Sequence, residues 1–525
     1  MLRRMFSIAV VLATILSMGA AAQNANPVVA AASKAMGADG LNSITYSGTA
    51  RNGQFGQSKA IGNPLGPNNL TQITAYTRTL NFGQADNPMA LVSRATGPTM
   101  PPAVPGAPAP MPGVFNQNIS AMQVSANFGQ ALNVLATPWG FLKAAAANNA
   151  TATAQGGQQV VSFSPANLMS PSGQRYTVTG YINNQNLVTK VETRVEHAVV
   201  GDLLREFEYS NYSNRNGVQV PGRIVEKQAG LETFNADITG ATANPANLAE
   251  LLTPPPAPAR GGAPAGAPGA PGAPAGAGRG APGAPPAGGP GGGGGGGQQA
   301  AAPPAVERLG EGVFKIGGNY TSLAIDMGDH ILVIESGQND ARGMAVMAAA
   351  KTAIPNKPIR FVVTSHAHFD HASGLAAAVA EGATILTHNN NEPVLERLLS
   401  GPRTLMGDSL SKVANRRTNV VQGVGDRDVR RGTNGKVVEL IRVENEHSDG
   451  LMVAYLPAEK VMWTADVTVV NATPVQLGVV RAAVDTFTRL NLDYTTFIPA
   501  HALNPERNLT KAEVMAALTP ATGTP

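Results

Sequence analysis

Four side chains that can bind a metal ion fall within six residues of this chain. They are His366, His368, Asp370 and His371. The stretch follows an apolar run at 359–363, which is typical of a buried strand, and precedes a predicted helix at 373–381. In an extended backbone the first two histidines point to the same side and can bind one cation, while the other two residues can serve a second cation once the chain turns. Because zinc favours imidazole and carboxylate ligands, the pattern predicts a metal site on this loop rather than a set of unrelated polar residues.

The order of these residues resembles the His-x-His-x-Asp-His signature of the metallo-β-lactamase superfamily. Three later segments, each beside an apolar strand, resemble further motifs of that superfamily: 446–450, 463–466 and 497–501. The motifs occur in the superfamily's order, and five of the eight histidines in the chain fall on ligand positions. The resemblance implies an α+β fold, an αββα sandwich, for the C-terminal part of the chain.

The resemblance also implies two metal ions. The implied ligands are His366, His368 and His447 for the first ion, Asp370, His371 and His501 for the second, and Asp466 as a bridge between them. Two zinc ions are expected, with iron or manganese as alternatives at one or both sites. One position departs from the family pattern, because Glu335 stands where members usually carry an aspartate that supports the ligand loop from behind.

The expected chemistry is hydrolysis of an ester, thioester, lactone or amide of a small-molecule substrate. Two neighbouring cations can lower the pKa of a shared water from 15.7 to about 7 and supply hydroxide at neutral pH. Asp370 is expected to orient that water as well as to bind metal. Within the superfamily the true zinc β-lactamases generally lack a bridging aspartate, so Asp466 favours lactone, ester or thioester substrates over β-lactams.

Three other functions stay open. A β-lactam-hydrolysing enzyme is the first. A metal-dependent oxidoreductase is the second, although di-iron relatives usually carry glutamate where this chain has His368. A non-enzymatic binding protein is the third, and the full ligand set argues against it because a structural zinc site takes four ligands.

Residues 253–304 are rich in proline, glycine and alanine and predict a disordered linker, because they cannot bury enough apolar surface to offset the entropy of ordering them. Residues 23–252 predict a β-rich domain of unknown role, with antiparallel strands around turns such as Asn216-Gly217. Residues 305–525 predict the hydrolase domain. Because all implied ligands follow residue 305, the fragment 305–525 is expected to bind metal and keep its chemistry alone.

The remaining three histidines are predicted to lie outside the site. His197 ends a strand and is predicted to be a solvated surface residue, and His330 an exposed turn residue. His388 follows a strand and is predicted to be structural.

Residues 1–22 predict a secretory signal peptide, with Arg3 and Arg4 before an apolar core at 8–16 and small residues at 20–22. A retained membrane anchor is the alternative. The chain has no cysteine, which excludes thiolate ligands and a lipid-modified cysteine, and no later apolar run could span a bilayer. The mature protein is therefore expected in the periplasm or outside the cell. With a net charge of +4 and no basic run, no nucleic-acid partner is expected, and the sequence leaves the oligomeric state open.

Overall fold

A computed structural model describes most of the chain. The described residues are 23–53, 55–57, 70–83, 89–97, 114–119, 128–166, 168–253, 303–470 and 472–519. The predicted signal peptide and nearly all of the predicted linker lie outside them, so the domain limits at 252/253 and 304/305 stay predictions. Across the described ranges, none of the helices is long and apolar enough to cross a bilayer.

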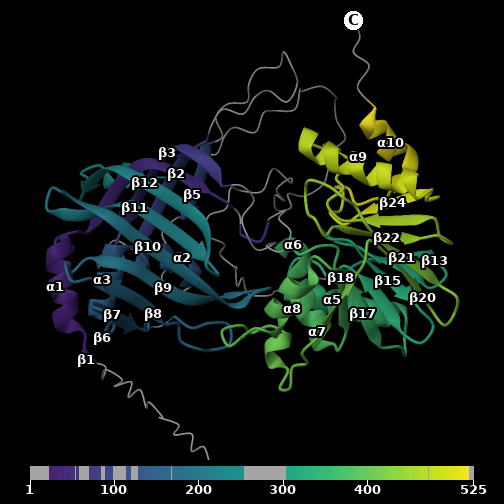
Figure 1. Cartoon of the computed structure of the whole chain (residues 1–525), viewed down its shortest axis with the longest axis horizontal. Coiled ribbons are helices and arrows are strands. Elements are labelled where there is room, and N and C mark those ends of the chain that lie inside the picture. Colours follow the sequence, from purple (N-terminus) through teal and green to yellow (C-terminus); the bar gives the residue numbers. More distant parts are fainter. Residues whose placement is uncertain are drawn as a thin grey trace, which may run out of the picture.

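One antiparallel sheet of twelve strands makes up most of the N-terminal region (Figure 1). Its strands are β1 (Gln23–Asn24), β2 (Ser43–Asn52), β3 (Thr71–Asn81), β4 (Ala90–Thr96), β5 (Val114–Ile119), β6 (Thr151–Gln155), β7 (Gln158–Phe163), β8 (Val178–Ile182), β9 (Val188–His197), β10 (Gly201–Arg215), β11 (Val218–Gln228) and β12 (Leu231–Ala243). Their order in the sheet is β1-β6-β7-β8-β9-β10-β11-β12-β2-β3-β4-β5. The helices of this region are α1 (Asn26–Met36), α2 (Phe128–Leu135), α3 (Pro138–Ala147) and α4 (Leu248–Leu252). Helix α3 packs on β7 and β9, α1 on β11 and α2 on β4, so these three helices cover part of the sheet.

The predicted antiparallel strands of this region are confirmed. The hairpin β10–β11 turns at Asn216 and Gly217, which both have positive φ, and pairs Arg215 with Val218. Helices α1 and α3 were not predicted. Each has a proline in its first turn, and a left-handed Gly37 follows α1.

The C-terminal domain contains two sheets. The first, in spatial order, is β13 (Val306–Gly310), β14 (Val313–Ile316), β15 (Ser322–Asp326), β16 (Ile331–Ile334), β17 (Ile359–Val363), β18 (Thr384–His388) and β19 (Val421–Val424). The second is β20 (Arg427–Arg431), β21 (Val437–Arg442), β22 (Met452–Leu456), β23 (Val461–Thr464), β24 (Thr496–Pro499) and β25 (Leu509–Thr510). The helices are α5 (Asp340–Ala353), α6 (Phe369–Ala372), α7 (Leu375–Ala380), α8 (Glu392–Ser400), α9 (Pro474–Arg489) and α10 (Lys511–Leu518), with a short 3-10 turn at Leu410–Lys412.

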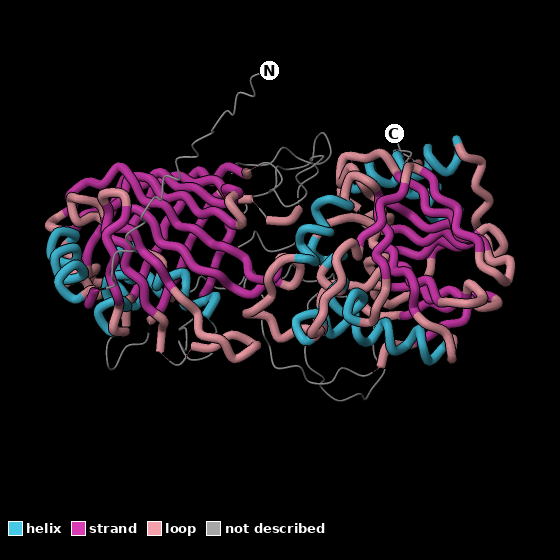
Figure 2. Tube along the Cα trace, turned by 60° about the horizontal axis from the view of Figure 1, so that its bottom comes forward, coloured by secondary structure: helices cyan, strands magenta, loops and turns pink. Residues whose placement is uncertain are grey.

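These elements form four layers. A buried apolar core joins the two sheets, with side chains such as Leu332 and Val363 from the first and Leu440 and Trp463 from the second. Helices α5, α7 and α8 cover the outer face of the first sheet, and α9 and α10 cover that of the second (Figure 1). Figure 2 shows the strands of this domain lying between its helices. The predicted αββα sandwich is therefore confirmed.

The two halves of the molecule are joined by a buried polar contact. Arg403, in the loop after α8, donates from Nη1 to the carbonyl oxygen of Val199 at 3.1 Å and also contacts Asp408. The carboxylate of Asp202, at the start of β10, accepts the backbone N–H groups of Thr404 at 3.0 Å and Leu405 at 2.9 Å. The turn between β9 and β10 is therefore bound to the loop after α8 by these hydrogen bonds.

Candidate metal centre

The candidate ligands come from loops that meet at one edge of the sandwich. Strands β16, β17 and β18 run parallel, as do β23 and β24, so the residues that follow β17, β23 and β24 are brought to a shared edge. The loop after β17 is fixed by backbone hydrogen bonds from Thr364 N–H to Leu386 O and from Met452 N–H to Ser365 O. The second of these bonds ties the first sheet to the second beside the ligands.

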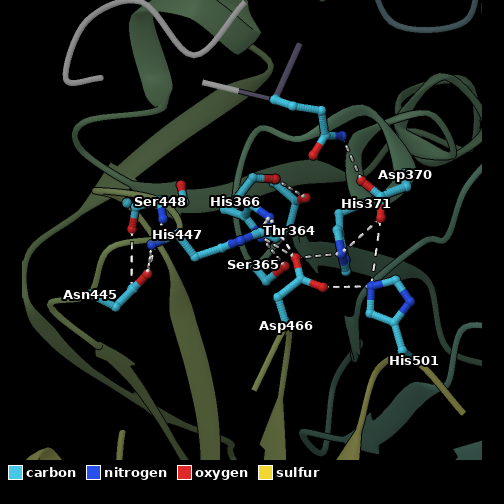
Figure 3. A network of polar contacts seen from close by, with 12 residues as sticks. Thr364, Ser365, His366, Asp370, His371, Asn445, His447, Ser448, Asp466 and His501 are labelled. Carbon is cyan, nitrogen blue, oxygen red and sulfur yellow. Dashed lines mark hydrogen bonds and ion pairs between the residues drawn. The ribbon is translucent and has the colours of Figure 1, made fainter. Parts of the chain in front are cut away.

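The structure gathers the seven side chains proposed as ligands into two groups. Figure 3 labels His366, Asp370, His371, His447, Asp466 and His501 of this set. The first group contains His366, His368, His447 and Asp466, and the second contains Asp370, His371, Asp466 and His501. Within each group the potential ligand atoms lie within 4.8 Å of one another. Asp466 belongs to both groups, as expected of a bridge.

Asp466 lies at the centre of the cluster. Its Oδ2 is 3.0 Å from Nε2 of His366, 2.8 Å from Nε2 of His447 and 3.1 Å from Nε2 of His371. Its Oδ1 is 2.5 Å from Nε2 of His501. The Nε2 atoms of His366 and His447 are themselves only 3.3 Å apart. Converging nitrogens around one carboxylate form a set of donors that suits divalent cations, so the residues present fit a pair of metal ions.

A buried carboxylate sets the orientation of two of these imidazoles. Glu335 Oε2 accepts a hydrogen bond from the Ser365 hydroxyl at 2.7 Å and lies 3.1 Å from Nδ1 of His371. Because the Ser365 hydroxyl proton is used in that bond, its oxygen must accept from Nδ1–H of His366, 3.0 Å away. Both histidines then present the lone pair of Nε2 to the centre, as metal ligands require. Glu335 therefore supports the ligand loop in spite of its extra methylene, from a backbone with φ of +67°.

The position of His447 is set by a turn around Asn445, a residue outside the sequence motifs. Asn445 Oδ1 accepts the backbone N–H of His447 at 2.6 Å and that of Ser448 at 3.0 Å. Its amide nitrogen donates to the carbonyl oxygens of Val443 and Ser448. An asparagine in such a turn holds its neighbours without a regular strand or helix.

Opposite charges stabilise one another within the cluster. Burial opposes the charged form of Asp466, but His371, followed by the other imidazoles around the carboxylate, holds the pKa of Asp466 well below its usual value. The same balance lowers the pKa of Asp370 to about 2, with His371 as the main favourable neighbour. Burial lowers the pKa of His366 to about 4. Neutral imidazole at His366 and anionic carboxylates are the protonation states that metal binding needs.

Asp370 has one hydrogen-bond donor on each carboxylate oxygen. The Tyr320 hydroxyl donates to Oδ2 at 3.1 Å, and Gln57 Nε2 donates to Oδ1 at 3.1 Å. Burial and the charge of Asp370 raise the pKa of Tyr320, which keeps its hydroxyl protonated. Neither donor belongs to a motif that the sequence reveals. Tyr320 forms a β-bridge with His501, which places it beside the proposed ligands, and Gln57 belongs to the N-terminal region.

The cluster is open on one side. The side chains of His366 and His371 are fully buried, whereas those of Asp370, His447 and His501 are 33%, 29% and 38% exposed. Solvent and small molecules can therefore reach the centre past these three residues.

The other histidines lie outside the two groups. The prediction of a solvated His197 was wrong, because its ring packs against Phe55 and Phe369 and its Nδ1 accepts backbone N–H groups at 3.2 and 3.3 Å. The prediction of an exposed His330 was also wrong, since it is 9% exposed and its ring contacts that of Phe361. His388 is buried, with Nε2 3.0 Å from Oδ1 of Asp426, in keeping with a structural role.

The match to a protein-family model agrees with this picture. The family model of the metallo-beta-lactamase superfamily matches residues 317–501, a range that includes all seven side chains. The chain is similar to a solved metallo-beta-lactamase from Hirschia baltica, with 18% identity and a TM-score of 0.31 over 41% of this chain and 96% of that one. It is also similar to one from Pontibacter korlensis, with 14% identity and a TM-score of 0.31 over 41% of this chain and 97% of that one. A third similar structure is the metallo-beta-lactamase FIM-1 from Pseudomonas aeruginosa in its mono-zinc form, with 13% identity and a TM-score of 0.31 over 42% of this chain and 95% of that one. No curated protein matches the sequence significantly.

Proposed function

Residues 317–501 of this chain belong to the metallo-β-lactamase superfamily, and we propose that the domain they form is a dinuclear, metal-dependent hydrolase. The observation that supports this proposal is the pair of four-residue groups that share Asp466. We propose zinc for both sites because the ligands are imidazole and carboxylate, with iron or manganese as alternatives.

The proposed ligands divide between the two ions. His366, His368 and His447 would hold the first, Asp370, His371 and His501 would hold the second, and Asp466 would bridge them. When bound, the two cations would lower the pKa of a water molecule and polarise the carbonyl group of the substrate.

The residues of the chain itself have distinct tasks. Glu335 keeps the Nε2 lone pairs of His366 and His371 directed at the centre, directly for His371 and through Ser365 for His366. Asp370 stays anionic at neutral pH, so it can both bind a cation and accept a hydrogen bond from an incoming water. Tyr320 holds Asp370 in place by a hydrogen bond to Oδ2.

We propose an ester, thioester or lactone as the substrate, with an amide as a weaker candidate. A bridging carboxylate adds negative charge between two cations and tempers their Lewis acidity, which suits activated acyl groups better than β-lactam amides. A β-lactam-hydrolysing enzyme is the alternative. An exported location and the absence of a nucleic-acid partner also remain proposals from the sequence.

A substrate panel tests this proposal. Zinc-loaded full-length protein should be assayed with aryl esters, acyl-homoserine lactones, thioesters and β-lactams at equal concentration. We expect turnover of at least one ester, thioester or lactone to exceed that of every β-lactam. Efficient carbapenem turnover without detectable ester, thioester or lactone hydrolysis would refute the substrate class, and a metal-loaded protein inert toward the whole panel would count against a hydrolase.

A further inference from the structure

We propose that the N-terminal region completes the metal centre, with Gln57 as a positioning residue for Asp370. The inference rests on the proposed function, since it concerns a ligand of the second ion. It runs against the expectation that residues 305–525 suffice for the chemistry, and it gives the N-terminal region a role in the reaction.

The contact begins with three aromatic rings that meet between the two halves. Phe369, which separates the proposed ligands His368 and Asp370, packs edge-on against Phe55 at 5.2 Å and against His197 at 4.5 Å between ring centroids. Phe55 and His197 also contact each other at 5.9 Å. Two rings of the N-terminal region thus enclose a side chain of the ligand loop itself.

The backbone beside Phe55 approaches the ligand loop too closely for any side chain. Gly56 has φ of +77°, and a Cβ atom built on it would lie 2.1 Å from the ring of Phe369. Only glycine satisfies both the left-handed backbone and the close approach. The segment 55–57 is therefore shaped to fit against Phe369.

This fit delivers the amide of Gln57 to Asp370. Gln57 Nε2 donates to Oδ1, the carboxylate oxygen that Tyr320 does not bind, at 3.1 Å. One donor from each half of the molecule thus fixes the plane of one carboxylate, and that plane determines which oxygen faces the second cation. Such partners of metal ligands typically change metal affinity or activity by 10- to 100-fold when they are removed.

The arrangement of the two halves is held at a second place. Arg403 and Asp408 are 3% and 6% exposed, and Asp202 is 8% exposed where it binds the backbone after Arg403. Buried charge pairs of this kind hold their geometry, because breaking one leaves an unpaired charge. These buried contacts of Asp202, Arg403 and Asp408 therefore help to hold segment 55–57 in place against the ligand loop.

Gln57 also lies on the open side of the centre, since it binds the partly exposed carboxylate of Asp370. A substrate that enters past Asp370 and His501 meets the N-terminal region as well as the sandwich. The same contact that orients the second ligand set thus forms part of the approach to the ions.

The test compares Gln57→Leu with Gln185→Leu in the full-length protein. Leucine nearly preserves the size of glutamine but cannot donate, and Gln185 lies on an exposed turn of the N-terminal region, which makes it a matched control. Competition of zinc with a chromophoric chelator gives the two stepwise affinities. We expect Gln57→Leu to weaken one of the two steps by 10- to 100-fold and leave the other unchanged, while Gln185→Leu changes neither. A purely structural role would weaken both steps together.

A second pair of variants probes the fit without changing a hydrogen-bonding side chain. Gly56→Ala places a methyl group against Phe369, whereas Gly217→Ala adds one at φ of +86° with no atom within 4 Å. We expect Gly56→Ala to reproduce the selective loss in zinc affinity and Gly217→Ala to keep both affinities, although both variants carry backbone strain.

The outcomes separate this inference from the proposed function. Wild-type protein that binds two zinc ions, together with Gln57→Leu and Gly56→Ala variants of unchanged affinity and turnover, would overturn the inference alone. Wild-type protein that takes up fewer than two ions would overturn the dinuclear proposal and the inference with it.

Discussion

The molecule contains two clusters of buried charged and polar groups, and they differ in how their charges are balanced. In the N-terminal sheet, Glu226 lies between Arg78 and Arg205, with contacts of 3.6 and 3.4 Å, and all three are at most 5% exposed. Aromatic rings cover the guanidinium groups. In the sandwich, imidazole nitrogens face each other around Asp466, and one side is open.

The difference separates a structural cluster from a functional one. In the sheet, the only carboxylate of the cluster, that of Glu226, is already paired with two arginines, so the cluster offers no open ligand position for a cation. In the sandwich, the imidazoles of four histidines converge on the one carboxylate of Asp466, and the cluster is open on one side, so it offers ligand positions for cations. Removing a residue should therefore cost stability in the first cluster and metal in the second.

The largest expected effect is on catalysis. His368→Ala should remove the first ion and reduce hydrolysis by three orders of magnitude or more, to roughly background, because the shared water loses one of its two cations. His388→Ala is the matched control, since His388 is buried and paired but lies outside both groups. Turnover and metal content should be measured together, and a fully active His368→Ala variant would contradict the ligand assignment.

Glu226→Ala should produce the largest loss of stability. It leaves two buried arginines without their carboxylate, and breaking such a buried pair costs about 3–5 kcal/mol of unfolding free energy. Metal content should stay at the wild-type value. Denaturant unfolding measures the loss of stability, and elemental analysis of the same preparation measures the metal content. Loss of metal in a folded variant would contradict the division into a structural cluster and a metal-binding cluster.

His197 should make the molecule less stable in mild acid. Burial and the nearby Arg403 lower the pKa of His197 to about 4, while an unfolded histidine has a pKa of about 6.5. The unfolded state therefore binds a proton that the folded state excludes, so stability is complete above about pH 6.5 and falls by up to about 3 kcal/mol as the pH drops to about 4. The unfolding midpoint should fall further between pH 7.5 and pH 5 for wild type than for His197→Gln, and equal losses in both proteins would argue against this residue as the source.

The smallest effect concerns Glu335. Glu335→Gln removes the charge that fixes the imidazoles of His366 and His371, and should weaken zinc binding by about 10- to 100-fold without abolishing it. Glu459→Gln, which disrupts a partly buried pair with Lys436 away from the centre, provides the control. Chelator competition is the measurement, and equal zinc affinities in both variants would show that Glu335 does not act on the ligands.

The metal loop was predictable because its information is local. His366 to His371 lie in one short segment after a buried strand, and their spacing indicated a metal site that could serve a second cation. The strands around Asn216-Gly217 were equally local. The three later motifs were found through the family resemblance, since nothing in their spacing brings His447, Asp466 and His501 together.

The contacts between the two halves could not be predicted. Gln57 and Asp370 are 313 positions apart, and Gln57 follows a strand in a segment with no distinctive composition. His197 looked like a surface residue because its ring partners, Phe55 and Phe369, come from distant parts of the chain. Glu335 was singled out only as a departure from the family pattern, and its bond to Ser365 needed the fold to become visible.

The most direct test of the account is the number of metal ions bound by each chain. Metal-free full-length protein should be titrated with zinc and the bound metal counted by elemental analysis after removal of excess. The two groups that share Asp466 predict two ions per chain, and a single ion for the His368→Ala variant. A wild-type protein that saturates with one ion or none would contradict the dinuclear centre on which the proposed hydrolase rests.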